Sequence, residues 1–430
     1  MFAATVVSAV LLTFVGGLNA AASPTQNLPP VMYFAPFLSG GGYCSEATSF
    51  LKTMAAAGAP VQIIQHGDSI NAEFLNGLHR EEAELVARHM QSVHLDPSVS
   101  VAICHSEPGA WHPPKWPTSR CPPPDALYSI GRTMFETADV PPGWIARLKA
   151  MDEIWVPSTF NVETFTQAGV PADKLVVVPE PVDTEFFSPA RGTERPFVYN
   201  NTKSYRFLSV GKWEARKGWD ILLRAYLTEF GPTEDVCLVI HTQPYHSDRP
   251  ITEAIAATIR EVLGMDPAGN ATLPALPCIE VISAHVPDDL MPGLYSGAQC
   301  LVQPSHGEGW GRPHVEAMSM GLPVIATNWS GTTAFLTPAN GYPLSIEGLQ
   351  PVGGTGSFRA HRWAQPSGGH LRTLMREVFT DRAGASARGE QARRDMVARY
   401  SVPVVGEVVT GHLERIARKV ASTHDQHTDL

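Results

Sequence analysis

The chain has 430 residues, of which 43% are hydrophobic and 17% are charged. This length exceeds that of a usual single domain, and the composition is typical of a globular protein with a sizeable core, which excludes a largely disordered chain. The formal net charge of -10 and the lack of a basic run argue against a nucleic-acid partner.

The first 22 residues form an apolar leader. Residues 1–18 carry no charged side chain, and residues 20–22 are three alanines, which is typical of a cleavage site. The segment predicts a signal peptide and a location in the secretory pathway (ER or Golgi lumen, or secreted) rather than in the cytoplasm; a signal-anchor or an organelle presequence is the alternative. No other stretch has the ~18 apolar residues that span a bilayer.

Strands and helices alternate from residue 30 onward. Val31–Phe34 and Val61–Ile64 are predicted strands, and Ser45–Ala57 is a predicted helix that follows a turn of three glycines. This order predicts an α/β fold with a doubly wound parallel sheet. Ligands bind at the carboxyl ends of such strands, so Gly41 and Gly42 are candidate ligand contacts.

Two titratable residues stand at the ends of later strands. His105 follows a strand over residues 99–104, and Glu136 closes a strand over residues 128–135. Both lie at the edge where chemistry is expected. His105 could act as a base or orient a hydroxyl or phosphate, or it could simply bond to the backbone.

The chain divides into two domains. We expect a first domain over residues 30–190, a polar linker over 191–204, a second domain over 205–385 and C-terminal helices over 386–421.

The second domain opens with a strand that runs into Gly211. Three cations, Lys212, Arg216 and Lys217, follow before a helix that begins at Trp219. They have the spacing to neutralise a diphosphate, although a solvated basic loop is the alternative.

A second glycine turn lies between residues 304 and 311. It follows a buried strand and opens onto a helix, so unpaired N–H groups and the helix dipole predict an anion site. Glu308 and Glu316, with seven residues between them, flank this site. Carboxylates repel a bare phosphate, so we expect them to accept hydrogen bonds from hydroxyls on either side of it, such as those of a sugar and a ribose. Two solvated glutamates are the alternative.

This block resembles the Glu-x7-Glu signature of retaining, nucleotide-sugar-dependent glycosyltransferases of the GT-B fold. These form the group-1 family, which includes bacterial phosphatidylinositol mannosyltransferases. The resemblance implies two Rossmann-like domains that face a cleft, with the last helix crossing back to the first domain. It also implies transfer of a hexosyl group from a nucleoside-diphosphate sugar to an unidentified glycan, lipid or small-molecule acceptor.

The resemblance further implies roles for individual residues. Glu308 would hold sugar hydroxyls, Glu316 the ribose, and Lys212 and Lys217 the phosphates, while relatives often have a histidine where Glu136 stands. The candidate catalytic residues are Glu308, Lys212, Lys217, His105 and Glu136. The candidate donor-binding residues are Gly41, Gly42, Gly211, Arg216, Gly309, Trp310, Gly311, Arg312 and Glu316.

We expect no cofactor and no metal, because no Asp-x-Asp triplet typical of metal-dependent GT-A enzymes occurs in the chain. One departure from the family is Thr333-Ala334, where relatives often carry a glutamate. A nucleotide-sugar epimerase or hydrolase, or a non-catalytic nucleotide-sugar binder, is the alternative function.

The six cysteines show no metal-ligand spacing. Cys104, Cys237 and Cys300 fall in apolar runs and are predicted core residues. A bridge between Cys104 and Cys121 is possible.

Overall fold

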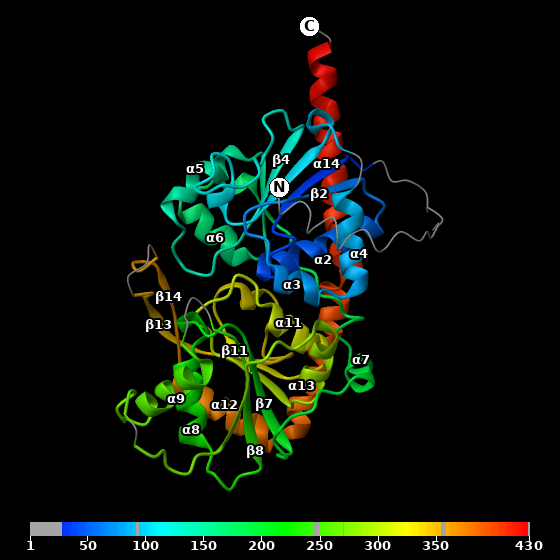
Figure 1. Cartoon of the computed structure of the whole chain (residues 1–430). Coiled ribbons are helices and arrows are strands. Elements are labelled where there is room, and N and C mark those ends of the chain that lie inside the picture. The colour runs from blue at the N-terminus through cyan, green and yellow to red at the C-terminus, as the bar shows by residue number, and fades with distance from the viewer. Residues whose placement is uncertain (1–27, 92–93, 245–248, 270, 354–357, 429–430) are drawn as a thin grey trace.

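The computed structural model describes residues 28–91, 94–244, 249–269, 271–353 and 358–428. The predicted leader, residues 1–22, therefore lies outside the described residues. Two domains are stacked on each other (Figure 1), and each contains a six-stranded sheet. All strands within these two sheets are parallel. The predicted α/β class with two doubly wound domains is confirmed.

The first sheet has the strand order β2-β1-β3-β4-β5-β6. β1 is buried along its whole length, which explains its continuous apolar sequence. The strands are β1 Val31–Ala35, β2 Val61–Gln65, β3 Val101–His105, β4 Tyr128–Arg132, β5 Glu153–Val156 and β6 Leu175–Val177. The helices are α2 Gly42–Ala56, α3 Ala72–Gly77, α4 Arg80–Met90, α5 Pro142–Ala150 and α6 Thr159–Gln167.

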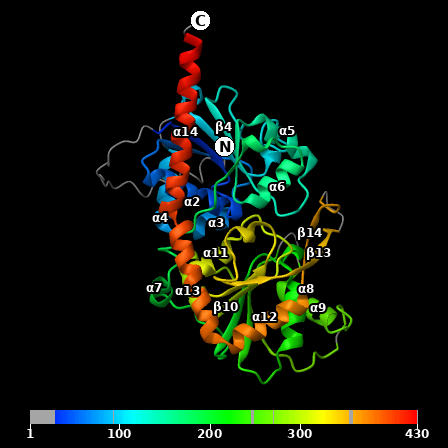
Figure 2. The same cartoon turned by 180° about the vertical axis from the view of Figure 1, so that it is seen from behind.

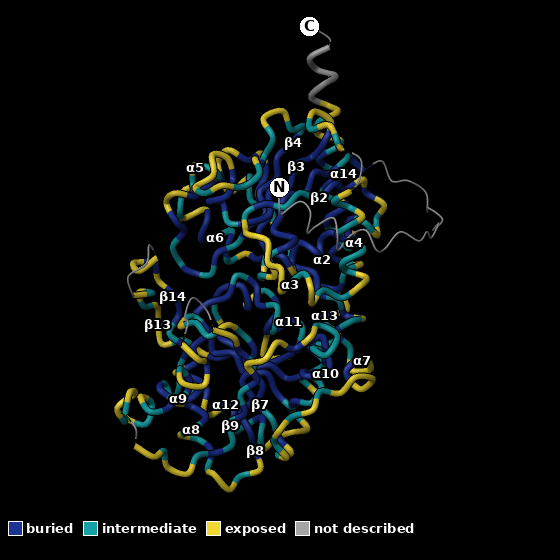
Figure 3. The backbone as a smooth tube through the Cα atoms, in the orientation of Figure 1, coloured by how far each residue is buried: buried dark blue, intermediate teal, exposed yellow. Residues whose placement is uncertain are grey.

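The second sheet has the order β12-β11-β10-β7-β8-β9. Its strands are β7 Tyr205–Val210, β8 Val236–His241, β9 Cys278–Ile282, β10 Cys300–Gln303, β11 Val324–Thr327 and β12 Tyr342–Leu344. Its helices are α8 Trp219–Glu229, α9 Ile251–Val262, α10 Met291–Ser296, α11 Arg312–Ser319, α12 Gly368–Thr380 and α13 Arg382–Arg399. The strands of both sheets are largely buried, and the exposed residues gather on loops and outer helix faces (Figure 3).

The chain crosses between the domains twice. The first crossing leads from β6 into α7, Pro189–Glu194, and the second leads from α13 into α14, Val402–Thr428. The two crossings touch, because the Val182 N–H donates to the Tyr400 carbonyl at 2.8 Å. α14 then runs along the first domain (Figure 2), where Val405, Val409, Leu413 and Ile416 join the core. The expected return of the last helix is confirmed.

A β-hairpin that the sequence analysis did not predict links the second domain to the first. β13 Ile346–Pro351 and β14 Arg362–Pro366 form a separate two-stranded antiparallel sheet. The Ala138 N–H donates to the Arg362 carbonyl at 2.8 Å, and the Arg362 guanidinium pairs with Asp139 at 2.9 Å. The hairpin therefore fastens the two domains on this side.

Four of the cysteines form disulfides. Cys104 pairs with Cys121 and Cys237 with Cys278, while Cys44 and Cys300 are free and buried. The predicted core positions of Cys104, Cys237 and Cys300 are confirmed, since all three are fully buried. The sequence analysis did not predict the Cys237–Cys278 bridge, whose residues stand opposite each other on β8 and β9. The Cys104–Cys121 bridge ties a proline-rich loop to the end of β3.

Replacing both Cys104 and Cys121 with alanine is expected to lower the free energy of unfolding by about 3 kcal/mol. The bridge closes a loop over a sequence separation of 17 residues, and a loop of this size gains about that much in the chain-entropy account. Urea denaturation monitored by tryptophan fluorescence measures the change. The buried free cysteine variant Cys300→Ser is the control for loss of a thiol. A double variant as stable as the wild type would contradict the prediction.

Candidate active site

A cavity of about 990 Å³ lies between the two domains. The first domain contributes the start of α2 and parts of α3 and α4, and the second contributes the ends of β7 and β8, the loop after β9 and the start of α11. Among the lining residues are Gly41, Ser45, Ser49, Lys52, Lys212, Thr242, Val286, Arg312 and Glu316.

The first-domain wall is one polar face of α2. Ser45, Thr48, Ser49 and Lys52 line the cavity, and their spacing of three and four residues places them on one side of the helix. Gly41 is the N-cap residue and makes no side-chain cap hydrogen bond, so the first N–H groups of α2 are available to an anion. Gly42, the next residue, does not line the cavity.

The facing wall contains the start of α11. Gly311 adopts a left-handed conformation (φ 117°), which favours glycine, and no side chain caps the helix. Arg312 and Glu316 both line the cavity. Glu316 accepts a hydrogen bond from the Tyr295 hydroxyl at 2.8 Å, and burial raises the pKa of Glu316. The predicted anion site and its neighbouring carboxylate are therefore together in the structure.

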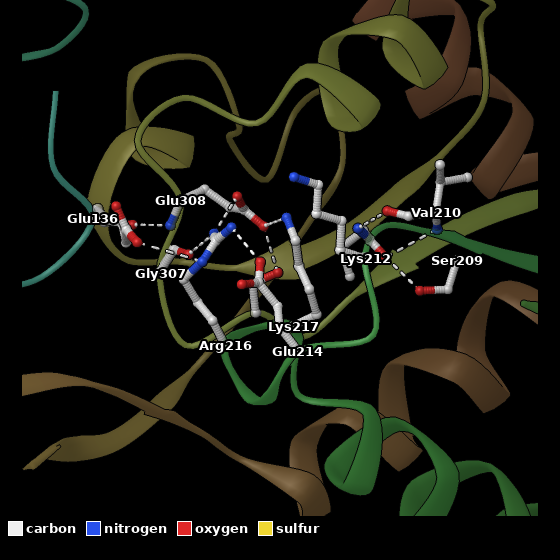
Figure 4. A network of polar contacts seen from close by, with 12 residues as sticks. Glu136, Ser209, Val210, Lys212, Glu214, Arg216, Lys217, Gly307 and Glu308 are labelled. Carbon is white, nitrogen blue, oxygen red and sulfur yellow. Dashed lines mark hydrogen bonds and ion pairs between the residues drawn. The ribbon is translucent and has the colours of Figure 1, made fainter. Parts of the chain in front are cut away.

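Glu308 lies behind this wall in a cluster of charges (Figure 4). Its carboxylate is 2.7 Å from Lys217 Nζ and 2.7 Å from Arg216 Nη1, and it accepts a hydrogen bond from Ser305 at 2.7 Å. Burial opposes its ionisation, but the two cations outweigh burial and hold the pKa of Glu308 well below its usual value. Glu308 is thus an ionised, fully paired carboxylate.

The three cations predicted to bind phosphate lie at different depths relative to the cavity. Lys212 and Gly211 line the cavity, whereas Lys217 is buried and does not. Lys217 lies directly behind Gly211, because a Cβ at Gly211 would be 3.3 Å from Lys217 Cε. Arg216 is paired with Glu308, Glu214 and Glu136, so its guanidinium organises the loop rather than the cavity wall.

The glycines of the turn allow the two domains to approach each other. A Cβ at Gly309 would be 2.5 Å from the sulfur of Met134, and a side chain at Gly307 would collide with the Glu136 carbonyl. Trp310 is only 2% exposed and packs against Phe335 and Tyr400. The turn directs the indole into the core, so only the backbone of this candidate donor-binding residue could meet a ligand.

His105 is not part of the cavity. Its side chain is fully buried between the Tyr33 hydroxyl, at 2.6 Å from Nδ1, and Glu46, at 2.9 Å from Nε2. Burial lowers the pKa of His105. The interpretation of His105 as a base facing the substrate is therefore wrong, since no surface of its ring reaches the cavity.

Glu136, the competing candidate, lies close to the charge cluster instead. One of its carboxylate oxygens is 3.4 Å from Arg216 Nε, and the side chain is partly exposed at 28%. The first domain thus contributes a carboxylate next to the Glu308 cluster.

Sequence reasoning did not assign Glu180. This residue is 3% exposed and lies 3.7 Å from Arg312. The signal available in the sequence was a charged residue before a proline soon after the last strand of the first domain. Nothing in the sequence showed that it would meet Arg312.

Within the described ranges, no three His, Cys, Asp or Glu side chains gather so that they could hold a metal ion. In the same part of the chain, no helix combines the length and the apolar character needed to cross a bilayer.

Known proteins share parts of this sequence and this fold. Residues 204–344 match the profile of a family described as "Glycosyl transferases group 1". The second domain is similar to these enzymes. A glycosyltransferase from Rickettsia africae ESF-5 superimposes with a TM-score of 0.63 at 15% identity, over 91% of this chain and 99% of that chain. Anabaena HepE, solved in complex with UDP and glucose, superimposes with a TM-score of 0.59 at 13% identity, over 90% and 99% of the two chains.

The fold is that of the GT-B glycosyltransferases. At such low identity the two structures establish the fold and no more. A D-inositol 3-phosphate glycosyltransferase of Corynebacterium jeikeium (strain K411) is 30% identical over 166 residues, which are 36% of each chain. The matches to curated relatives cover 12% to 52% of those proteins.

Proposed function

We propose that the protein is a glycosyltransferase that moves a hexosyl group from a nucleoside-diphosphate sugar to a hydroxyl acceptor. The observation that carries the proposal is the cavity between the domains, which brings together Lys212, Arg312, Glu316 and the uncapped start of α2. Two cations and two helix starts fit a diphosphate, and a carboxylate one turn along α11 fits ribose hydroxyls. The similarity of residues 204–344 to group 1 glycosyl transferases supports it.

The proposed reaction breaks the bond between the anomeric carbon and the donor phosphate. Negative charge grows on the leaving diphosphate as this bond breaks. A unit charge about 4 Å away gains on the order of 4 kcal/mol at an effective dielectric near 20. Lys212, Arg312 and the helix N–H groups lie where this charge grows, so they stabilise the transition state more than the ground state.

The side chains behind the cavity wall have a supporting role in this proposal. Glu308 holds Lys217 and Arg216 in place, and it could accept hydrogen bonds from sugar hydroxyls if Lys217 shifts toward the phosphates. The proposal includes retention of the anomeric configuration and no metal ion, as the resemblance of the Glu-x7-Glu block implies. It assigns no nucleophile.

An assay of donor turnover with and without acceptors tests the function. The full chain is incubated with UDP-, GDP- and ADP-sugars, first alone and then with candidate glycan, lipid and small-molecule hydroxyl acceptors. A glycosylated acceptor supports the proposal. An isomerised or hydrolysed donor without transfer favours the epimerase or hydrolase, and binding without turnover favours the binder.

Replacing Glu316 with alanine is expected to abolish the thermal shift caused by the productive nucleotide sugar. The variant loses the carboxylate that would accept ribose hydroxyls, together with its hydrogen bond from Tyr295 and its ion pair with Arg312. Differential scanning fluorimetry measures the shift for the wild type and the variant. Tyr295→Phe is the matched control, since it removes the same hydrogen bond and keeps the carboxylate. An unchanged shift in Glu316→Ala would show that Glu316 has no role in donor binding.

The proposed location is the secretory pathway. The apolar leader motivates it, and the Cys104–Cys121 and Cys237–Cys278 bridges support it, because disulfides persist in oxidising compartments. Sequencing the N-terminus of the protein from its native cells tests this. A mature chain that begins near residue 23 in a lumenal or secreted fraction supports the proposal, and an intact Met1 in the cytosol contradicts it.

A further inference from the structure

Arg312 is a side chain of the second domain that reaches the first domain from inside the cavity. Its guanidinium lies between two carboxylates, with Nη1 3.7 Å from Glu180 and Nε 3.7 Å from Glu316. Nη2 is 3.4 Å from the Ser49 hydroxyl on α2. The guanidinium therefore faces both domains and the cavity at once.

The hydrogen-bonding capacity of this guanidinium is only partly used. At these distances the carboxylates attract its charge but do not accept its N–H groups. Within the described residues, Nε and Nη1 of Arg312 are buried without a hydrogen-bond partner, and so is Oε2 of Glu180. Buried donors without partners are rare and costly, so they indicate a ligand that completes them. Neither nitrogen is accessible from the cavity in this arrangement, so an anion there would accept these N–H groups after the guanidinium turns toward it.

Glu180 belongs to the first crossing between the domains. The Arg132 guanidinium donates to the Val178 carbonyl at 2.5 Å and fixes the segment on the first-domain side. On the other side, Val182 pairs with Tyr400 and Ser401 at the second crossing. Glu180 thus lies on the hinge, between its two anchors.

Glu180 attracts the Arg312 guanidinium less strongly than a diphosphate would. Burial and the nearby Glu46 carboxylate raise the pKa of Glu180 well above its usual value, so its negative charge is disfavoured. A diphosphate carries more charge and is only partly desolvated in the cavity. It can therefore attract the guanidinium and change its contact with the hinge.

We propose that Arg312 couples occupation of the diphosphate site to the hinge between the domains, with Glu180 as the positioning residue on the hinge. The inference rests on the proposed function, because a nucleoside diphosphate is the ligand that would meet Arg312. When the guanidinium turns so that Nε and Nη1 donate to the diphosphate, its contact with Glu180 changes, and the hinge segment that carries Glu180 moves with it. Donor binding then favours the closed arrangement of the domains.

The experiment measures binding and closure separately in the full chain. Isothermal titration calorimetry with UDP and with GDP gives affinity. Hydrogen exchange of the peptides that contain Ala138 and Arg362 reports closure, because the Ala138 N–H donates across the domains at a place away from Arg312. In the wild type, the diphosphate that binds is expected to slow exchange in these peptides.

Glu180→Gln is expected to keep the affinity within about threefold and to lose at least half of the protection at saturating diphosphate. Arg312→Lys, which retains the charge but not the planar fork, should lose more than tenfold in affinity and the protection with it. Glu153→Gln is the matched control: Glu153 is a buried first-domain glutamate that pairs with Arg415 of α14, outside the cavity. It should behave as the wild type.

The outcomes distinguish the two proposals. If wild-type protein binds neither UDP nor GDP, the proposed function is wrong. If a diphosphate binds and Glu180→Gln shows full protection, the proposed function stands and the hinge coupling is wrong. Should Glu180→Gln fail to fold, tight binding and full protection in Arg312→Lys would also overturn the coupling.

Discussion

Replacing Glu308 with glutamine is expected to lower the rate of sugar transfer by at least about 100-fold, a loss typical of disturbing fixed electrostatic groups in an active site. The change leaves the buried Lys217 ammonium without the carboxylate that it meets at 2.7 Å, whereas Arg216 keeps its ion pairs with Glu214 and Glu136. Breaking a buried ion pair in this way typically costs about 3–5 kcal/mol of stability. Steady-state donor turnover and urea denaturation measure the two effects.

The double variant Glu308→Gln, Lys217→Met is the control for this prediction. It removes the ammonium that Glu308→Gln leaves buried without a carboxylate, so it should be less destabilised than the sum of the two single variants. If the losses in the free energy of unfolding of the two single variants add up to the loss in the double variant, Glu308 and Lys217 are not coupled. If Glu308→Gln turns over the donor as fast as the wild type, Glu308 has no role in the proposed reaction.

The buried carboxylate of Glu46 is expected to make the protein sensitive to acid. Burial opposes its charge, but Arg132 and then His105 outweigh burial and lower the pKa of Glu46 to about 2. A carboxylate with a lowered pKa stabilises the fold fully above its unfolded-state pKa and loses this contribution as the pH falls toward its folded-state pKa. Between pH 5 and pH 2 the loss from Glu46 is about 3 kcal/mol.

Glu46→Gln should therefore be about 3–5 kcal/mol less stable than the wild type at pH 7, because Arg132 is left buried without its carboxylate. The difference should shrink as the pH is lowered from 5 to 3. Urea denaturation at pH 7, 5 and 3 measures it. Glu84→Gln, which breaks an exposed ion pair with Arg80, is the control and should cost less than about 1 kcal/mol. If the stability difference between Glu46→Gln and the wild type does not change with pH, Glu46 does not have a lowered pKa in the folded protein.

The parts of the site that could be predicted are local in sequence. Two such parts are the strand that leads into Gly211 and Lys212 and the glycine turn that opens onto α11. In each of them, a few consecutive backbone angles determine where the residues lie. The same is true of the uncapped start of α2. Such patterns specify which residues stand at the edge of a parallel sheet, and the cavity is formed by that edge in both domains.

The parts that could not be predicted depend on partners distant in sequence. His105 was one of two candidates for the active site, but Glu46, 59 residues earlier, and Tyr33 enclose it. The Cys237–Cys278 bridge required knowledge that β8 and β9 are adjacent. Glu308 was recognised, but its pairing with two cations depends on a loop 91 residues away. Side-chain partners across elements are set by packing, which periodicity does not reveal.

The return of α14 has a consequence for how the protein is made. The core of the first domain includes Val405, Val409, Leu413 and Ile416. A ribosome synthesises these residues after the whole second domain, so the half of the protein that emerges first cannot complete its interior until translation is nearly over. All strands of the second-domain sheet are synthesised before α14, so the second domain can fold before the first domain is complete. A nascent chain truncated before residue 402 should therefore remain a substrate for chaperones, with an apolar groove where α14 belongs.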